Sequence, residues 1–373
     1  MKKIIAAASL LAFLQFSLLQ FANAQLTSLP SGGNKKASVS ERVGITDITI
    51  HYDRPGVKGR EGQIYGKLIP VGYADLGFGN TKQAPWRAGA NENTTIEFSD
   101  DVKIEGHDLP AGKYGFFVAY DPNECTLIFS KNYNSWGSFY YDPKEDVLQV
   151  KVKPVALDKS VEWLKYEFIN ETENSATIAL QWEKLMIPFK VEVDYNKTQL
   201  ESFRKELRSE RGFVFEAWVQ AAQWCIQKNT NLDEALLWAD TACSVNFGGD
   251  HSFQSWSTKA QVLEKLGRSN EAAEAMKTGL PFANEFEIHQ YGRQLLKEKK
   301  NKEAFDVFKM NYDKHPNSFT STLGLARGYS ALGNYKKALE LAQKAQPLAT
   351  DAVNKANVEK LIGILKEGKD INN

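Results

Sequence analysis

The sequence is poor in cysteine. Its 373 residues contain three, Cys125, Cys225 and Cys243, whereas a small exported scaffold held by disulfides has more and in even number. The last two are predicted to lie on opposite helices of one hairpin, about 12 Å apart along the axis at 1.5 Å per residue. A disulfide requires Cα atoms within about 7 Å. We therefore predict three buried free thiols.

An excess of charge of one sign is also missing. The chain has 46 Lys and Arg residues against 46 Asp and Glu residues, and without Lys2 and Lys3 the balance is 44 to 46, or about −2. Such a balance gives no general attraction to nucleic acid. Beyond residue 24 there is no run of 18 consecutive apolar residues, so no membrane span is expected in the mature chain.

Motifs of the common enzyme classes are absent. There is no G-x-S-x-G, the segment GREGQIYGK (residues 59–67) lacks the spacing of a phosphate-binding loop, and GFG (residues 77–79) lacks the third glycine of a dinucleotide site. His51, Asp53, Glu92 and His107 are metal-ligand types, but no H-x-x-x-H or paired-cysteine spacing accompanies them. We predict no metal and no cofactor.

The N-terminus has the pattern of a secretory signal peptide. Lys2 and Lys3 precede an apolar stretch at residues 4–21, and Ala22-Asn23-Ala24 forms a small-x-small cleavage site. The alternative, a membrane anchor helix, is opposed by Gln15 and Gln20 within the stretch. We predict a signal peptide at residues 1–24, a flexible segment at 25–36, and an exported protein that is periplasmic or secreted.

From Ser38 to about Tyr195 the apolar residues recur with a period of two. One example is the alternation of Ile48, Ile50 and Tyr52 with polar residues, which is typical of a strand with one buried face. Turn segments such as LPAGKY and YDPKED separate about eight or nine such strands. The pattern predicts an antiparallel β-sandwich at residues 37–195.

After residue 196 the period changes to about 3.6, and the sequence repeats. Recurring residue pairs lie 37, 32 and 34 residues apart, at Glu234-Ala235, Glu271-Ala272, Glu303-Ala304 and Lys337-Ala338. Small residues stand twelve positions before the last three alanines, at Ala260, Gly292 and Ala326. This spacing is typical of tetratricopeptide repeats. We predict a connecting helix at 196–211 and a tetratricopeptide-like solenoid at 212–373.

Three motifs of the β half carry a family resemblance. YDRPGVKGR, WRAGANENTTIEFSDDVKIEGHDLPAGKYGFF and DPKEDVLQVKVKP are similar to those of an exported bacterial family known as domain-of-unknown-function family 2911. The resemblance spans about residues 30–195. It implies export, a β domain and often C-terminal tetratricopeptide units, and it brings no established activity and no assigned catalytic residues.

Two polar, glycine-containing loops of the β half form the candidate ligand site. Their charged and carboxamide residues are Asp53, Arg54, Lys58, Arg60, Arg87, Asn91 and Glu92. Guanidinium groups bind carboxylates or phosphates, and carboxamides match vicinal hydroxyls, so a saccharide or small anion is expected. The structural alternative is a turn in which Arg87 pairs with Glu92 or Asp53. We predict that Arg87 is partly buried and structural, while Asn91 and Glu92 face a ligand.

The helical half is expected to bind a protein partner. Counting from the repeated alanines places Gln261, His289, Arg293, Lys297 and Arg327 in its groove. This mildly basic set suits an acidic or C-terminal peptide, although a purely structural array remains open. The leading interpretation is therefore an exported two-domain binding protein. The alternative is a periplasmic, glycosidase-like hydrolase that uses Glu92 with Asp53, Asp100 or Asp101.

Overall fold

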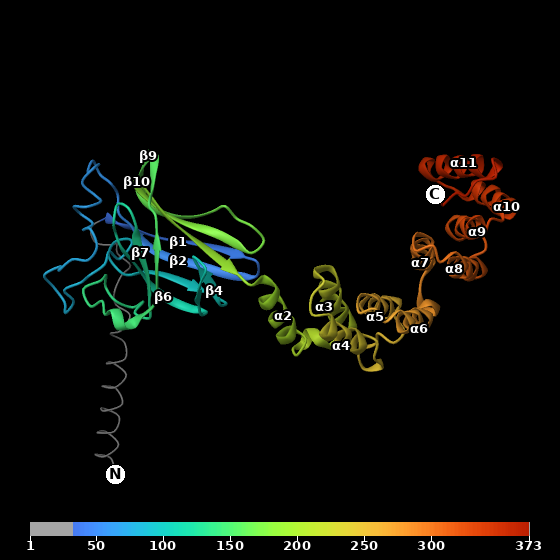
Figure 1. The fold of residues 1–373 in the computed structure, drawn as a ribbon, viewed down its shortest axis with the longest axis horizontal. Coiled ribbons are helices and arrows are strands. Elements are labelled where there is room, and N and C mark those ends of the chain that lie inside the picture. Colours follow the sequence, from blue (N-terminus) through green and yellow to red (C-terminus); the bar gives the residue numbers. More distant parts are fainter. Residues whose placement is uncertain (1–32, 373) are drawn as a thin grey trace, which may run out of the picture. The chain divides into compact units, whose positions relative to one another are not determined.

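The computed structural model describes residues 33–372. The chain divides into two compact units, and the boundary in the sequence lies between Glu201 and Ser202 (Figure 1). The predicted signal peptide and residues 25–32 lie outside the described residues. The predicted flexible segment is wrong at its C-terminal end, because Lys35 and Lys36 are already in a strand and pair with Arg54 and Asp53. Among residues 33–372, no helix combines the length and apolar character needed to cross a bilayer.

The N-terminal unit consists of two antiparallel sheets. The larger has the order β1-β2-β3-β6-β7-β8 and the smaller β5-β4-β10-β9. The larger contains β1 (Lys35–Val43), β2 (Thr46–Arg54), β3 (Thr94–Phe98), β6 (Gly112–Ala119), β7 (Cys125–Ser130) and β8 (Asp146–Val152). The smaller contains β4 (Val102–Ile104), β5 (His107–Leu109), β9 (Val155–Ile169) and β10 (Ser175–Val193). The prediction of a β-rich, antiparallel N-terminal part is confirmed.

The apolar faces of both sheets contribute to one core. Ile48, Ile50 and Tyr52 are buried together on β2, as their alternation predicts. Phe116 of β6 lies 5.5 Å from Phe189 of β10, measured between ring centroids, so the two sheets meet through their aromatic side chains. On the opposite face of β6 and β7, Phe117 and Ile128 form a smaller apolar cluster with Tyr141.

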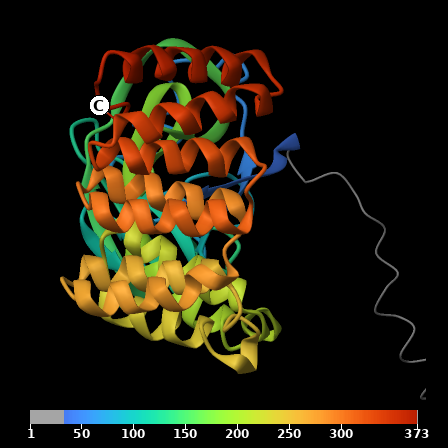
Figure 2. The ribbon, with the colours of Figure 1, turned by 90° about the vertical axis from the view of Figure 1, so that its right-hand side faces the viewer.

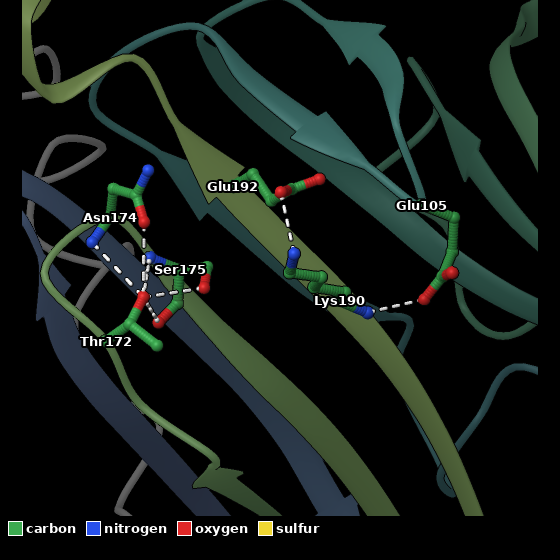
Figure 3. Close-up of polar contacts among 6 residues, drawn as sticks. All are labelled: Glu105, Thr172, Asn174, Ser175, Lys190 and Glu192. Carbon is green, nitrogen blue, oxygen red and sulfur yellow. Dashed lines mark hydrogen bonds and ion pairs between the residues drawn. The ribbon is translucent and has the colours of Figure 1, made fainter.

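The two longest strands, β9 and β10, are joined by a tight turn stabilised by side chains (Figure 3). The Thr172 hydroxyl lies 2.8 Å from the Ser175 hydroxyl and accepts hydrogen bonds from the backbone N–H groups of Asn174 and Ser175. Further along β10, the backbone N–H of Lys190 donates to Glu105 at 2.6 Å. This contact holds the β4–β5 turn against the long hairpin.

Ten α-helices follow within the described residues. Their bounds are α2 (Tyr195–Glu206), α3 (Phe215–Lys228), α4 (Leu232–Ala242), α5 (Phe253–Lys265), α6 (Ser269–Gly279), α7 (Glu285–Lys297), α8 (Asn301–Lys314), α9 (Phe319–Ala331), α10 (Tyr335–Ala345) and α11 (Ala352–Lys366). From α3 to α10 they form four antiparallel hairpins, which Figure 2 shows stacked in chain order. The architecture resembles tetratricopeptide repeats, as predicted.

Small residues at fixed places allow the helices of this unit to approach closely. Ala235, Ala272, Ala304 and Ala338 are all buried, which explains their repetition at equivalent places. A Cβ on Gly292 would come within 2.6 Å of the Phe308 ring, so α7 and α8 touch there. The repeated alanines and glycine are therefore packing positions.

The cysteines of the chain are buried free thiols, as predicted. Cys225 lies in α3, and Cys243 follows the last residue of α4, so the two belong to the two arms of one hairpin. Burial raises the pKa of Cys225 to about 11 and that of Cys243 to about 12. Thiols with such pKa values are poor nucleophiles near neutral pH.

The connecting helix is shorter than predicted. α2 ends at Glu206, and a 3-10 turn at Glu210–Phe213 occupies the end of the predicted 196–211 segment. The chain bends because Gly212 lies directly against the backbone of Leu207, where a Cβ would be 1.9 Å from the carbonyl oxygen. The Ser209 side chain accepts a hydrogen bond from the Arg211 N–H and caps the new turn.

Candidate functional site

Hydrogen bonds and packing contacts of Arg87 hold the 87–93 loop in one conformation. Arg87 donates from Nη1 to the carbonyl of Asn91 at 2.6 Å, and its guanidinium lies 5.2 Å from the centre of the Phe139 ring. Gly137 fits against the guanidinium, since a Cβ there would be 2.3 Å from it. Burial lowers the pKa of Arg87, which nevertheless remains charged near neutral pH. Arg87 therefore has the structural position that the sequence predicted, although its partners are a carbonyl and a ring rather than a carboxylate.

Further hydrogen bonds fix the backbone of the loop over strand β2. Tyr166 donates to the carbonyl of Ala88 at 2.7 Å, and Trp86 Nε1 donates to the carbonyl of Gly89 at 3.1 Å. Gly89 lies against the backbone of Asp53, since a Cβ there would be 3.1 Å from the Asp53 carbonyl oxygen. A side chain at position 89 would push the loop away from β2. The loop thus covers Asp53 by close backbone approach.

Asp53 and Glu92 form a carboxyl pair beneath this loop. Asp53 is 4% exposed, and its carboxyl group lies close enough to that of Glu92 for each to shift the pKa of the other. Asp53 Oδ1 and Glu92 Oε2 are buried, and neither accepts a hydrogen bond from a donor group of the described residues. Lys36 Nζ lies 2.6 Å from Glu92 Oε1 and supplies the local positive charge. Because two carboxylates in contact repel, a shared proton is the arrangement that satisfies both buried oxygens.

The two carboxyl groups differ in proton affinity. Burial, together with Glu92, raises the pKa of Asp53 from 3.8 to about 6. Burial also works to raise the pKa of Glu92, but hydrogen bonds to Lys36 and Asp53 hold it below its usual value. Both carboxyl groups are therefore mostly ionised at pH 7, whereas below about pH 6 Asp53 takes up a proton and Glu92 keeps its negative charge.

Asn91 stands at the edge of the carboxyl pair with a left-handed backbone, at φ 54°. Its side chain lowers the pKa of Asp53 through a hydrogen bond, and its Oδ1 accepts one from Asn34 at 3.3 Å. Asparagine tolerates this conformation better than most residues. The structure thus brings together Asp53, Asn91 and Glu92 of the predicted site, and adds Lys36 and Asn34.

Three predicted site residues lie elsewhere. Arg54 donates to the carbonyl of Leu164 at 2.8 Å, and Arg60 donates to the carbonyls of Val57 and Gly56. Lys58 lies 5.8 Å from the Trp163 ring of β9. Arg54 is separated from Asp53 because successive strand residues point to opposite faces. These three residues have other partners than the carboxyl pair, and the single composite site stays a prediction for them.

The other carboxylates considered for hydrolysis are also distant from Glu92. Asp100 and Asp101 follow β3, whereas Glu92 precedes it. At about 3.3 Å per residue, the five residues of β3 separate them by roughly 17 Å. Asp101 accepts the N–H of Ala111 at 2.9 Å, and Asp100 accepts the Ser99 hydroxyl at 2.7 Å. Both are turn-stabilising residues.

The helical unit contains a groove of about 1060 Å³ between the hairpins α5–α6 and α7–α8. We call it the inter-hairpin groove. Its lining includes Gln261, Arg293 and Lys297 of the predicted set. Four basic and four acidic residues line it, namely Lys265, Arg293, Lys297, Lys300, Glu264, Glu287, Glu298 and Glu303. The groove is therefore balanced in charge, and the prediction of a basic groove is corrected.

The remaining two predicted groove residues have different surroundings. Burial, with Arg327 nearby, lowers the pKa of His289 to about 4, so this histidine is neutral near pH 7. Arg327 is 7% exposed and donates to the carbonyl of Ile371, so residues 370–372 of the C-terminal segment cover it. Among residues 33–372, no group of three or more His, Cys, Asp and Glu residues is arranged to hold a metal ion.

Several residues that shape these sites had no motif in the sequence. Lys36 reaches Glu92 because β1 pairs with β2 in a register that places Lys36 opposite Asp53. Phe286 and Tyr291 line the inter-hairpin groove, and Phe286 is 63% exposed. An apolar residue on the polar face of an amphipathic helix is the signal that would have identified Phe286.

The β unit has a family match. Residues 34–191 match the family model described as "Protein of unknown function (DUF2911)". This match confirms the resemblance carried by the motifs, and the description assigns no activity. A comparison with curated proteins gives no match.

Solved structures resemble the chain weakly. They include a double mutant of MamA from strain RS-1 (19% identity, 42% of this chain, 86% of that chain, TM-score 0.31). Another is YrrB, described as a TPR protein with an unusual peptide-binding site (15% identity, 46% of this chain, 88% of that chain, TM-score 0.31). A third is PilF of Pseudomonas aeruginosa (17% identity, 41% of this chain, 72% of that chain, TM-score 0.29). These scores are too low to carry an argument, so the repeat architecture rests on the hairpins themselves.

Proposed function

We propose that the protein is an exported binding protein whose helical unit docks a segment of a partner protein in the inter-hairpin groove. The observation that carries the proposal is the size and lining of this groove. Its volume of about 1060 Å³ is slightly larger than that of small-molecule sites, which span about 300–1,000 Å³. A peptide segment fills such a space better than a small metabolite does.

The chemistry of the groove favours a segment with an apolar anchor flanked by charges of both signs. Phe286 is exposed, and Phe253, Met276 and Tyr291 lie with it in the lining. Aromatic residues at the centre of a contact supply much of the binding free energy in protein interfaces. The surrounding Lys and Glu residues determine the register in which the segment binds more than they determine how tightly it binds.

The test is a peptide-binding measurement on the mature chain. Peptides are selected from a random library on the immobilised protein, and their affinity is measured by fluorescence anisotropy. Phe286→Ser and Lys297→Glu should each weaken binding about tenfold, or about 1.4 kcal/mol. The matched control is Leu237→Ser, because Leu237 is 65% exposed on α4 and lies outside the groove lining. Equal binding by all three variants would exclude the groove.

A second function is favoured by the carboxyl pair. In this proposal the β unit is a sandwich whose loops bind a saccharide or another small polar ligand through Asn91 and Glu92. Supporting it is the exposure of the loop's carboxylate, since the Glu92 side chain is 40% exposed. A thermal-shift screen of saccharides tests it, with Glu92→Gln and Asn91→Gly as variants. Glycine is chosen at position 91 because it keeps the left-handed backbone.

A carboxylate-dependent hydrolase is less well supported. Retaining glycosidases place their carboxyl groups about 5 Å apart, and inverting ones farther apart. Asp53 and Glu92 lie close enough for Glu92 to raise the pKa of Asp53, so they are not held apart around a bound glycosidic bond. Asp53 is also covered by the 87–93 loop. Hydrolysis of a chromogenic glycoside that is lost in Glu92→Gln would reverse this judgement.

Export is part of the proposal. Its support is the pattern of residues 1–24, with a basic start, an apolar stretch and a small-x-small site. N-terminal sequencing of the protein from its native host should begin at Gln25. An N-terminus that retains the apolar stretch would favour an anchored protein.

A further inference from the structure

The C-terminal segment, residues 370–372, lies against helix α9 as a turn, in which the Asn372 N–H donates to Asp370 Oδ1 at 3.2 Å. Asp370 Oδ1 accepts the Ser330 hydroxyl at 2.6 Å, and the Ile371 N–H donates to the same hydroxyl at 3.1 Å. Arg327 Nη1 donates to the carbonyl of Ile371 at 3.1 Å. The side-chain amide of Asn372 donates to the carbonyl of Arg327 at 3.0 Å. Helix side chains thus bind both the backbone and the side chains of the segment.

An apolar side chain completes the contact. Ile371 is 4% exposed and packs with Leu323 and Ala326 of α9 and with Leu361 of α11. The segment reaches this place because the chain reverses after α11, with Gly368 at φ 70°.

The segment occupies the helix face that forms the groove in the neighbouring repeats. Gln261, Arg293 and Arg327 each follow the small residue at equivalent places in α5, α7 and α9. The first two line the inter-hairpin groove, and the third is covered by residues 370–372. The α9 part of this face is therefore filled by the chain itself.

The contact leaves one strong donor unused. Arg327 is 7% exposed, and its Nε finds no acceptor among the described residues. Burial, with Arg293 nearby, lowers the pKa of Arg327 to about 10, while Asp370 opposes this shift. His289 lies nearby and is neutral near pH 7, so it adds no second charged donor. The Ile371 carbonyl accepts only one of the hydrogen bonds that the Arg327 guanidinium can donate. A partner segment with a carboxylate at this place would accept more of them.

We propose that residues 370–372 are an internal ligand, and that the α9 surface binds partner segments of the same acidic–aliphatic–carboxamide pattern in competition with them. This inference rests on the proposed docking function of the helical unit. Three residues, 367–369, join the segment to α11. A tether this short gives an effective concentration in the millimolar range. A competing segment must therefore overcome this local concentration, and removal of the tail should raise its apparent affinity at least tenfold.

The probe is a fluorescein-labelled peptide of residues 366–373, KEGKDINN. A specific protease site replaces residues 367–369 in the mature chain, so that the tail is cut only after folding. The cut protein should bind the peptide saturably and at least tenfold more tightly than the uncut protein. A peptide with Ile371→Asp should bind the cut protein at least tenfold more weakly than the unchanged peptide. Phe286→Ser should leave tail-peptide binding unchanged, so failure of the groove and failure of this inference are separable.

Four outcomes would overturn the proposal. The first is equal binding to cut and uncut protein. The second is a cut protein that keeps its helical circular dichroism and binds no peptide. The third is loss of the helical fold both on cutting and in full-length Ile371→Asp, because the segment would then be a structural cap. The fourth is a dimer of the uncut chain that dissociates on cutting, which would assign the tail to a second copy.

Discussion

Replacing Asp53 with Asn should change how the stability of the β unit depends on pH. The pKa of Asp53 is raised from 3.8 to about 6 in the folded chain, so the folded state holds this proton more tightly than the unfolded state. Stability from this group is therefore present at low pH and is lost as pH rises from about 4 through 6. With Asp53 4% exposed, a shift of this size corresponds to about 2–3 kcal/mol.

We expect the free energy of unfolding of Asp53→Asn to increase relative to that of the wild type as pH rises. Asparagine keeps the size of aspartic acid, cannot ionise, and can donate a hydrogen bond to Glu92 as the protonated acid does. At pH 4 the two proteins should have nearly equal free energies of unfolding. At pH 7 Asp53→Asn should be more stable by about 2–3 kcal/mol.

Hydrogen exchange read by mass spectrometry is the suitable assay, because peptides from β2 and β3 report the opening of this unit separately from the helices. Asp47→Asn is the matched control, since Asp47 lies on the same strand, and its pKa is lowered by the hydrogen bond from Arg42. Its stabilising contribution is already complete above its unfolded pKa, so Asp47→Asn should be less stable than the wild type by an amount that changes little between about pH 5 and 7. A difference between wild type and Asp53→Asn that stays constant from pH 4 to 7 would refute the shared proton.

Other substitutions test the turns and the packing. Lys299 in the α7–α8 turn has φ 59°, and Gly267 occupies the equivalent position of the α5–α6 turn with φ 74°. Lys299→Gly should therefore stabilise the helical unit by about 0.5–1 kcal/mol, and Gly267→Ala should destabilise it. Both effects are measured by thermal melting at 222 nm. Arg87→Ala should lower the free energy of unfolding by about 1–3 kcal/mol, because it removes the donor to the Asn91 carbonyl and the stacking on Phe139; an unchanged urea midpoint would contradict this. Ala304→Leu should cost about 1–3 kcal/mol by overpacking α7 against α8, and a neutral effect would show that the repeated alanine is incidental.

The repeat half was largely predictable because its signal is redundant. Ala235, Ala272, Ala304 and Ala338 recur at the period of a helical hairpin, and each is buried. Helical contacts are local in sequence, so spacing alone fixes which residues meet. The alternation of Ile48, Ile50 and Tyr52 predicted the inner face of β2 for the same reason.

The candidate site was only partly predictable because it depends on strand parity and register. Tyr52 is buried in the core, and Arg54 lies on the same face of the strand as Tyr52, whereas Asp53 lies on the opposite face. This separation could have been predicted from the alternation in the sequence. The partner Lys36 required the β1–β2 register, which short-range patterns do not specify. The placement of Ile371 on α9 depends on a chain reversal after α11, and the short polar tail carries no periodic signal for it.

Site-specific photo-crosslinking in the native host addresses the proposed docking function. Benzoylphenylalanine replaces Phe286 in the inter-hairpin groove, and the same replacement at Leu237 is the control of similar exposure outside it. We expect irradiation to give one dominant covalent adduct from position 286, absent from position 237 and diminished by Lys297→Glu. Identical adducts from both positions, or none from position 286, would contradict the assignment of the groove as the partner-binding site.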